Sequence, residues 1–179
     1  MLVKWLVFLS QQVVYNQSLS YHNKIKRALS LYDRAFFYLS DKGVIVEKLL
    51  LKVNSEESSQ FIDITAGVSE AVRESGIMNG LCHIFIPHTT AAVTINENAD
   101  PNVEYDIIQT LNRLVPNDPA YRHMEGNSDA HAKSSIVGAS QVVAINDGRL
   151  ALGTWQAIYF CEFDGPRTRK VWINIINAD

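Results

Sequence analysis

Three histidines stand among residue types that bind anions or metal ions. His88 is followed by Thr89 and Thr90 where a predicted strand ends, and His123 and His131 lie in a polar stretch further along the chain. A neutral imidazole binds a divalent ion or donates a hydrogen bond to a phosphate oxygen, and threonine hydroxyls add further donors. The spacing of His123 and His131 matches no standard zinc motif. A packed histidine beside a turn closed by threonines would explain the first group equally well, so both readings stay open.

Carboxylates and polar side chains near the histidines supply the other groups that such a site needs. Glu97 and Asp100 precede a helical pattern; helix capping alone explains Asp100 but not Glu97, which is a candidate ligand or general base. Asp129 is a second candidate for that role. Polar loops often carry such residues without any function, and this alternative stays open. The candidates for holding substrate oxygens are Thr89, Thr90, Asn127, Lys133, Gln156 and Arg167.

Two glycine-containing motifs would place some of these side chains at turns. In Gly153-Thr154-Trp155-Gln156 the glycine indicates a bulge or close backbone approach, Trp155 is expected in the core or an interface, and Gln156 would face a ligand. In Asp164-Gly165-Pro166-Arg167 the turn presents an arginine that suits a phosphate. Alternatively, Arg167 pairs with Glu162 or Asp164.

Alternating and helical patterns predict the elements that position these residues. Strands are predicted over 44–53, 61–65, 81–87, 91–96, 141–145, 149–152, 155–163 and 168–176. Helices are predicted over 68–75 and from Asp100-Pro101 to Pro116, and residues 117–135 read as a long polar loop. Asn146-Asp147-Gly148 is typical of a hairpin turn. Hairpins grouped around two helices indicate an α+β fold with a mainly antiparallel sheet.

Length, composition and charge limit the class of protein. A chain of 179 residues with 47% hydrophobic content fits one globular domain, which we place at residues 44–179, with residues 1–43 as an N-terminal extension. The net charge of −3 argues against a nucleic-acid partner. No run of 18 apolar residues is present, which argues against a membrane span, and the apolar start lacks a clear cleavage site, so we expect a cytoplasmic protein. Cys82 and Cys161 are expected as reduced thiols in the core.

The order of the motifs resembles that of the YjbQ-type family over roughly residues 44–176. Gly153-Thr154-Trp155-Gln156 is the most specific of them. The motifs are His-Thr-Thr-Ala-Ala at 88–92, Ile-Asn-Glu-Asn-Ala-Asp-Pro at 95–101, Ala-His at 130–131, the run 148–156 that ends in Gly-Thr-Trp-Gln, and Glu-Phe-Asp-Gly-Pro-Arg at 162–167.

The resemblance implies a compact α+β fold, a homotrimer, and the family's label of secondary thiamine-phosphate synthase. That activity joins a hydroxymethylpyrimidine diphosphate to a thiazole phosphate and releases pyrophosphate. The resemblance matches His88, His123 and His131 to the family's histidines. It likewise matches its acidic positions to Glu97, Asp100 and Asp129. Residues 1–43 have no counterpart in the family.

Three hypotheses about function follow. The first is an enzyme acting on a phosphorylated small molecule, with the three histidines holding a divalent ion (zinc or magnesium) or the phosphate itself. The second is a metal-dependent hydrolase in which the histidines hold an ion that activates water. The third is a trimeric ligand-binding protein without chemistry of its own.

Overall fold

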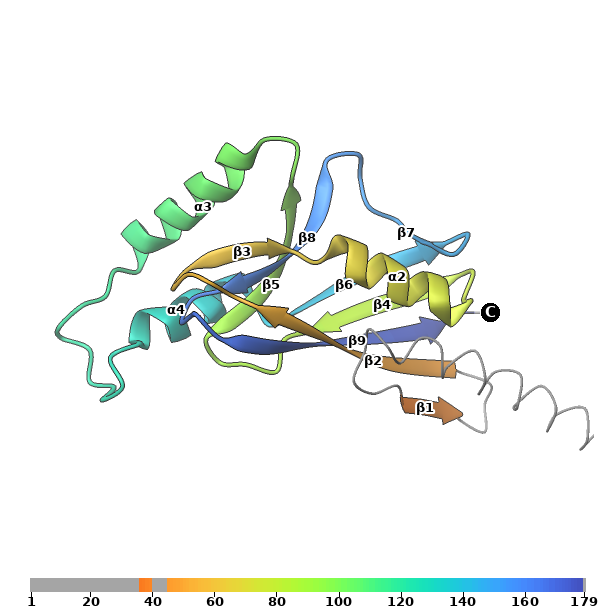
Figure 1. Ribbon diagram of the computed structural model, residues 1–179, viewed down its shortest axis with the longest axis horizontal. Coiled ribbons are helices and arrows are strands. Elements are labelled where there is room, and N and C mark those ends of the chain that lie inside the picture. Colours follow the sequence, from red (N-terminus) through yellow and green to blue (C-terminus); the bar gives the residue numbers. More distant parts are fainter. Residues whose placement is uncertain (1–35, 40–44, 179) are drawn as a thin grey trace, which may run out of the picture.

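The computed structural model describes residues 36–39 and 45–178 of the chain. Figure 1 shows strands that form two layers, with helices on one side of each layer. In chain order the elements are β1 (Phe36–Leu39), β2 (Ile45–Asn54), β3 (Gln60–Asp63), α2 (Thr65–Ser75), β4 (Gly80–Phe85), β5 (Ala91–Glu97), α3 (Pro101–Leu114), α4 (Ser128–Val137), β6 (Ser140–Asn146), β7 (Arg149–Leu150), β8 (Gln156–Glu162) and β9 (Thr168–Asn177).

The larger sheet has six antiparallel strands in the order β1-β2-β9-β4-β6-β7. Its strands alternate between a buried inner face and an outer face because successive side chains point to opposite sides. In β4, for example, Cys82 and Ile84 are fully buried while Leu81 and Phe85 are exposed. The sequence predicted this alternation, and the structure confirms it.

The smaller sheet has three antiparallel strands in the order β3-β8-β5 and lies between two hydrophobic clusters. Its central strand β8 is buried on both faces: Ile158 and Phe160 face the cluster shared with α2 and the six-stranded sheet, while Tyr159 and Cys161 face the cluster shared with α3 and α4. The fold is therefore α+β with mainly antiparallel sheets, as expected from the sequence.

Local sequence signals account for several boundaries. The helix α3 begins where Asp100 accepts a hydrogen bond from the Asn102 amide and Pro101 takes the first helical position. The helix α2 ends at Gly76, whose positive φ of 70° suits glycine. The hairpin between β6 and β7 turns through Asp147 and Gly148, both with positive φ. These three features were predicted.

The helix α4 is the main difference from the expected elements. It occupies part of the stretch predicted as a loop over residues 117–135, so the described residues contain three helices rather than two. Its buried residues are Ala130, Lys133 and Ser134, which do not make an apolar stripe, so no helical period marks this helix in the sequence. Trp155 was expected in the core or an interface; it is not in the core, because 64% of that residue is exposed, and the interface stays a prediction.

The structure also bears on the expected thiols and on the expected absence of a membrane span, but not on the domain boundary. Both cysteines are buried free thiols, and burial raises the pKa of Cys82 to about 12. In the described part of the chain, no helix is long and apolar enough to cross a membrane. Residues 1–35 and 40–44 lie outside the described residues, so the domain boundary at residue 44 stays a prediction.

Candidate functional site

The first part of the site is the segment of residues 86–90 between β4 and β5, called the corner below. The pairing of β4 with β9 stops at Phe85 opposite Trp172, so β4 offers no partner to the amide of Lys170. The His88 ring takes that place: its Nε2 accepts a hydrogen bond of 2.9 Å from the Lys170 N–H. His88 thus adds one hydrogen bond to β9 beyond the point where the pairing of β4 with β9 ends.

This hydrogen bond decides what the His88 ring can offer to a ligand. A neutral imidazole has one lone pair and one N–H, so an acceptor at Nε2 leaves the proton on Nδ1. Burial lowers the pKa of His88, and the positive charge of Arg169 lowers it further. The ring is therefore a neutral donor through Nδ1–H. Its lone pair is used inside the protein.

The two threonines of the corner differ in what they can contact. The Thr89 residue is exposed, and its carbonyl accepts a hydrogen bond from the hydroxyl of Ser134 on α4. Thr90 is 5% exposed, and its hydroxyl accepts a hydrogen bond from Arg169. Thr89 can donate to a ligand, whereas Thr90 faces the interior.

A buried ion pair lies directly behind the corner. Glu162 is fully buried, and its two carboxylate oxygens accept from the guanidinium of Arg169 at 2.6 and 2.7 Å. The hydroxyl of Ser55 and the amides of Phe163 and Asp164 also donate to this carboxylate. Every oxygen of the carboxylate is hydrogen-bonded, which is the condition under which a buried charge is tolerated.

Hydrogen bonds from Asn127, Lys133 and Ser134 connect the helix α4 and its N-cap residue to the rest of the fold. Ser134 bonds to the corner, and Asn127, just before the helix, donates to the carboxylate of Asp164 at 3.1 Å. Lys133 donates to Asp129 at 2.9 Å and to Asn112 of α3 at 2.8 Å. The Lys133 side chain is 5% exposed and that of Asp129 is 16% exposed. Lys133 and Asp129, both predicted as site residues, therefore form an ion pair with each other.

The other two predicted histidines lie against each other. The rings of His123 and His131 are 5.2 Å apart between centroids and meet edge to face. His123 also lies 3.8 Å from a carboxylate oxygen of Glu125. Across residues 36–39 and 45–178, no group of three His, Cys, Asp or Glu side chains could hold a metal ion. The lone pair of His88 is also in use, so the three histidines of a single chain in this arrangement do not surround one ion. Binding of a divalent ion by these histidines stays a prediction.

Arg167 makes the ion pair with Asp164 that the sequence offered as one of its two roles, and its phosphate role stays a prediction. Its guanidinium donates to the backbone oxygen of Asp164 at 2.7 Å and to the carboxylate of the same residue at 2.9 Å. Its side chain is 52% exposed. A guanidinium has five N–H donors, so three remain for a ligand. This turn requires glycine at position 165, because a Cβ there would collide with the backbone oxygen of Glu57.

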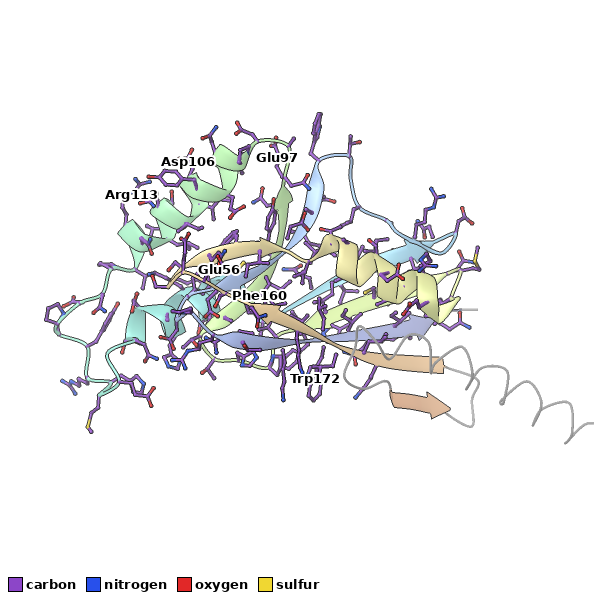
Figure 2. The ribbon with its side chains drawn as sticks, in the orientation of Figure 1. Glu56, Glu97, Asp106, Arg113, Phe160 and Trp172 are labelled. Atoms are coloured by element: carbon purple, nitrogen blue, oxygen red, sulfur yellow. The ribbon has the colours of Figure 1, made fainter. Side chains whose placement is uncertain are left out.

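Two predicted site residues lie far from the corner. Along the pairing of β5 with β8, Ala91 opposes Glu162 next to the corner, while Glu97 opposes Gln156 at the other end. Six residues of strand separate these ends by about 20 Å. Gln156 closes the preceding turn by accepting from the Gly153 amide at 2.8 Å. Figure 2 shows Glu97 beside the start of α3, away from α4. The structure therefore divides the predicted site between two ends of the small sheet.

Sequence reasoning missed Arg169, Ser134 and the Lys170 amide. A signal existed for Arg169, because it occupies an inward position in the alternation of β9. An arginine among buried strand residues needs a buried acid, since a lone charge is costly there. No local pattern indicates the Lys170 amide, because its role arises only where β4 ends.

The sequence matches one protein family along most of its length. The model of the family described as "UPF0047 protein YjbQ-like" matches residues 50–178. A UPF0047 protein of Methanocaldococcus jannaschii is 49% identical over 135 residues, which cover 74% of this chain and 98% of the relative. The UPF0047 protein YugU of Bacillus subtilis is 51% identical over 127 residues, covering 70% of this chain and 96% of the relative.

Solved structures show the same fold. A YjbQ/UPF0047 family protein from Clostridium acetobutylicum is 52% identical, with a TM-score of 0.69, covering 70% of this chain and 98% of that one. A protein from Sulfolobus solfataricus is 32% identical, with a TM-score of 0.72, covering 75% of this chain and 99% of that one. The second is described as a protein of unknown function.

Proposed function

The chain belongs to the YjbQ-like UPF0047 family, and from that premise we propose that it is an enzyme that binds the phosphate of a small molecule at the corner. The finer proposal is thiamine-phosphate synthase activity, which the motif resemblance suggested. The observation that carries the proposal is the His88 ring, whose lone pair is used by Lys170 and whose Nδ1–H remains as a donor. A donor without a free lone pair suits an anionic oxygen and does not suit a metal ion.

Two residues of neighbouring segments carry further donors. Thr89, the next residue, is exposed and carries a hydroxyl, and Arg167 keeps three N–H donors in a turn joined to the start of α4 through Asp164 and Asn127. Donors aimed at developing negative charge are the usual means of stabilising a phosphate that leaves. We therefore assign His88, Thr89 and Arg167 to the phosphate.

Thiamine-phosphate synthesis would use these donors on the leaving group. The bond between the hydroxymethyl carbon and the diphosphate oxygen breaks, and that carbon bonds to the thiazole nitrogen. Pyrophosphate departs with the bonding electron pair, so its added charge is what the protein must neutralise. The thiazole nitrogen carries no proton, and the proposal accordingly needs no general base.

The candidate acids have a different place in this proposal. Asp129 accepts from Lys133 inside the protein, and both support α4 rather than contact substrate. Glu97 lies at the far end of the small sheet, so it would reach the same substrate only from another copy of the chain. The metal-dependent hydrolase has no observation in its favour, because the described residues offer no three-ligand group.

Self-association has support of its own. The outer face of the six-stranded sheet exposes Leu81, Phe85, Val142 and Trp172, and within the described residues no helix packs on it. Figure 2 shows Trp172 on the side of this sheet away from Phe160. Exposed apolar patches of this kind mark contact surfaces. We propose that this face joins copies of the chain, in line with the homotrimer that the resemblance implies.

Calorimetric titration with pyrophosphate tests the binding proposal. His88→Ala should weaken binding about tenfold, since a lost hydrogen bond to a charged group costs about 1.5 kcal/mol. Tyr105→Ala is the control, because Tyr105 is 62% exposed near the start of α3, at the Glu97 end of the small sheet, and should bind as the wild type does. A wild-type protein that binds no pyrophosphate, or a His88→Ala variant of unchanged affinity, would contradict the proposal.

Two further measurements separate the rival functions. Incubation with both thiamine precursors, followed by chromatography of thiamine phosphate, separates an enzyme from a ligand-binding protein. Binding without turnover would favour the latter. Repeating the titration with a chelator and then with added zinc tests the hydrolase, for which affinity and phosphoester cleavage should depend on the metal.

A further inference from the structure

The hydrogen bond between His88 and Lys170 depends on two segments that are distant in sequence. The corner carries the acceptor ring, and β9 carries the donor amide. Neither segment alone fixes the distance between them, because β4 and β9 stop pairing at Phe85. Something else must hold the corner against β9 at this point.

The buried Glu162–Arg169 pair contacts both segments. Arg169 immediately precedes Lys170 in β9, so fixing its side chain fixes the strand that carries the donor amide. The same guanidinium donates to the hydroxyl of Thr90 at 3.0 Å, two residues after His88. The amide of Phe163, next to Glu162, donates to the Thr90 carbonyl at 3.2 Å. The pair is therefore joined both to the strand that carries the donor amide and to the corner that carries the acceptor ring.

The stability of the fold does not by itself account for such a pair. Burying two charges costs desolvation free energy, and their mutual attraction often does no more than offset that cost. Apolar residues of equal size in the same place are frequently as stabilising. An arginine does offer a fixed geometry, since its planar fork binds a carboxylate through two bonds and leaves further donors in defined directions. Here one of those directions points to Thr90.

We propose that Arg169, held by Glu162, is a positioning residue for the corner, and that the Arg169–Thr90 hydrogen bond keeps His88 in the tautomer with its proton on Nδ1. The chain from Glu162 through Arg169 and Thr90 to His88 thereby sets the direction of the donor that the phosphate meets. This inference rests on the proposed function for its ligand but not for its geometry.

The sharpest variant is Thr90→Val, which removes the hydroxyl and leaves the ion pair in place. Its matched control is Thr168→Val, on the same strand as Arg169. The Thr168 hydroxyl bonds to Asn54 instead, at 2.8 Å, and not to the pair. Arg169→Lys is the second variant, because a lysine keeps the charge beside Glu162 but cannot bridge both Glu162 oxygens and Thr90. Thermal melts followed by circular dichroism establish which variants are folded.

Two readouts are measured on each folded variant. Long-range ¹H–¹⁵N NMR of the ligand-free protein identifies which nitrogen of His88 carries the proton, and calorimetry gives the affinity for pyrophosphate. The wild type and Thr168→Val should show the single Nδ1–H tautomer. Thr90→Val and Arg169→Lys should show a mixture of tautomers and bind about fivefold more weakly, in keeping with the loss of one hydrogen bond.

The outcomes separate the two proposals. If the wild type binds no pyrophosphate, the proposed function fails, while the tautomer still tests the positioning role. If folded Thr90→Val and Arg169→Lys keep the wild-type tautomer, the positioning role is overturned, whatever happens to their melting temperatures. A purely structural role would lower those temperatures and leave the tautomer unchanged.

Discussion

At the scale of single residues, the buried carboxylate of Glu162 links the site to the stability of the fold. Burial alone would raise its pKa, but the hydrogen bond from Arg169, the amide of Asp164, the Arg169 charge and the hydroxyl of Ser55 together outweigh burial. The pKa is lowered as a result. A group with a lowered folded pKa contributes stability above its unfolded pKa of about 4.3, and this is lost as the pH falls through the folded value.

The first prediction concerns this pH dependence. Glu162→Gln should lower the free energy of unfolding at pH 7 by about 3 kcal/mol, because Arg169 is left buried without its charge partner. It should also lose less stability than the wild type between neutral pH and the acid range below 4. Urea unfolding across this range measures both. Glu125→Gln, at a side chain that is 74% exposed, is the control and should follow the wild type. Parallel curves for wild type and Glu162→Gln would contradict the prediction.

At the scale of elements, the tie between α4 and α3 is made by polar atoms. Lys133→Met should destabilise the fold by about 3 kcal/mol, because Asp129 and Asn112 both lose their partner in a largely buried place. Adding Asp129→Leu should recover part of the loss, since the unpaired acid is then gone. Chemical unfolding of the single and double variants completes the cycle. A double variant whose loss equals the sum of the single losses would show that the two side chains are not coupled.

The same helix shows where sequence reasoning ended. Most strands could be predicted because their burial alternates, as in Cys82 and Ile84 of β4, and the start of α3 because Asp100 and Pro101 are typical of a helix N-terminus. The helix α4 could not, since Ala130, Lys133 and Ser134 are buried through hydrogen bonds and small size rather than through an apolar stripe.

The candidate site was predictable in composition but not in arrangement. The corner residue His88 and the turn residue Arg167 stand out as chemical types in the sequence. Their partners do not, because the Lys170 amide and the Arg169 guanidinium become neighbours of the corner only through the pairing of distant strands. The separation of Glu97 from the corner likewise follows from strand length and pairing, which residue types alone do not indicate.

At the scale of the whole molecule, the outer face of the six-stranded sheet is the strongest candidate for contact between copies. Trp172→Lys should convert the assembled protein to monomers in sedimentation, because a charge would enter an apolar contact. Trp155→Lys is the matched control: that tryptophan is also exposed, but it lies in the turn before β8 rather than on the outer face. A monomeric wild type, or an assembly that Trp172→Lys leaves intact, would contradict the proposed contact.

The extent of the folding unit gives a second prediction at this scale. Among residues 48–178, whose burial the structure describes, the two hydrophobic clusters extend from Leu49 to Ile175, and β1 is an end strand that pairs with β2. A chain that lacks residues 1–43 should therefore remain soluble and melt cooperatively within about 5 °C of the full chain, a shift that corresponds to about 1 kcal/mol. Calorimetry of the two chains compares them. A truncated chain that aggregates or melts without a cooperative transition would show that residues 1–43 belong to the domain.

We propose above that the corner binds a phosphate through His88 as a donor. A crystal of the full chain soaked with pyrophosphate and zinc tests it most directly. We expect an anion whose oxygens lie within hydrogen-bond distance of His88 Nδ1 and the Arg167 guanidinium, with the bond from the Lys170 amide to His88 Nε2 intact. Zinc bound to His88, or pyrophosphate bound only elsewhere, would contradict it.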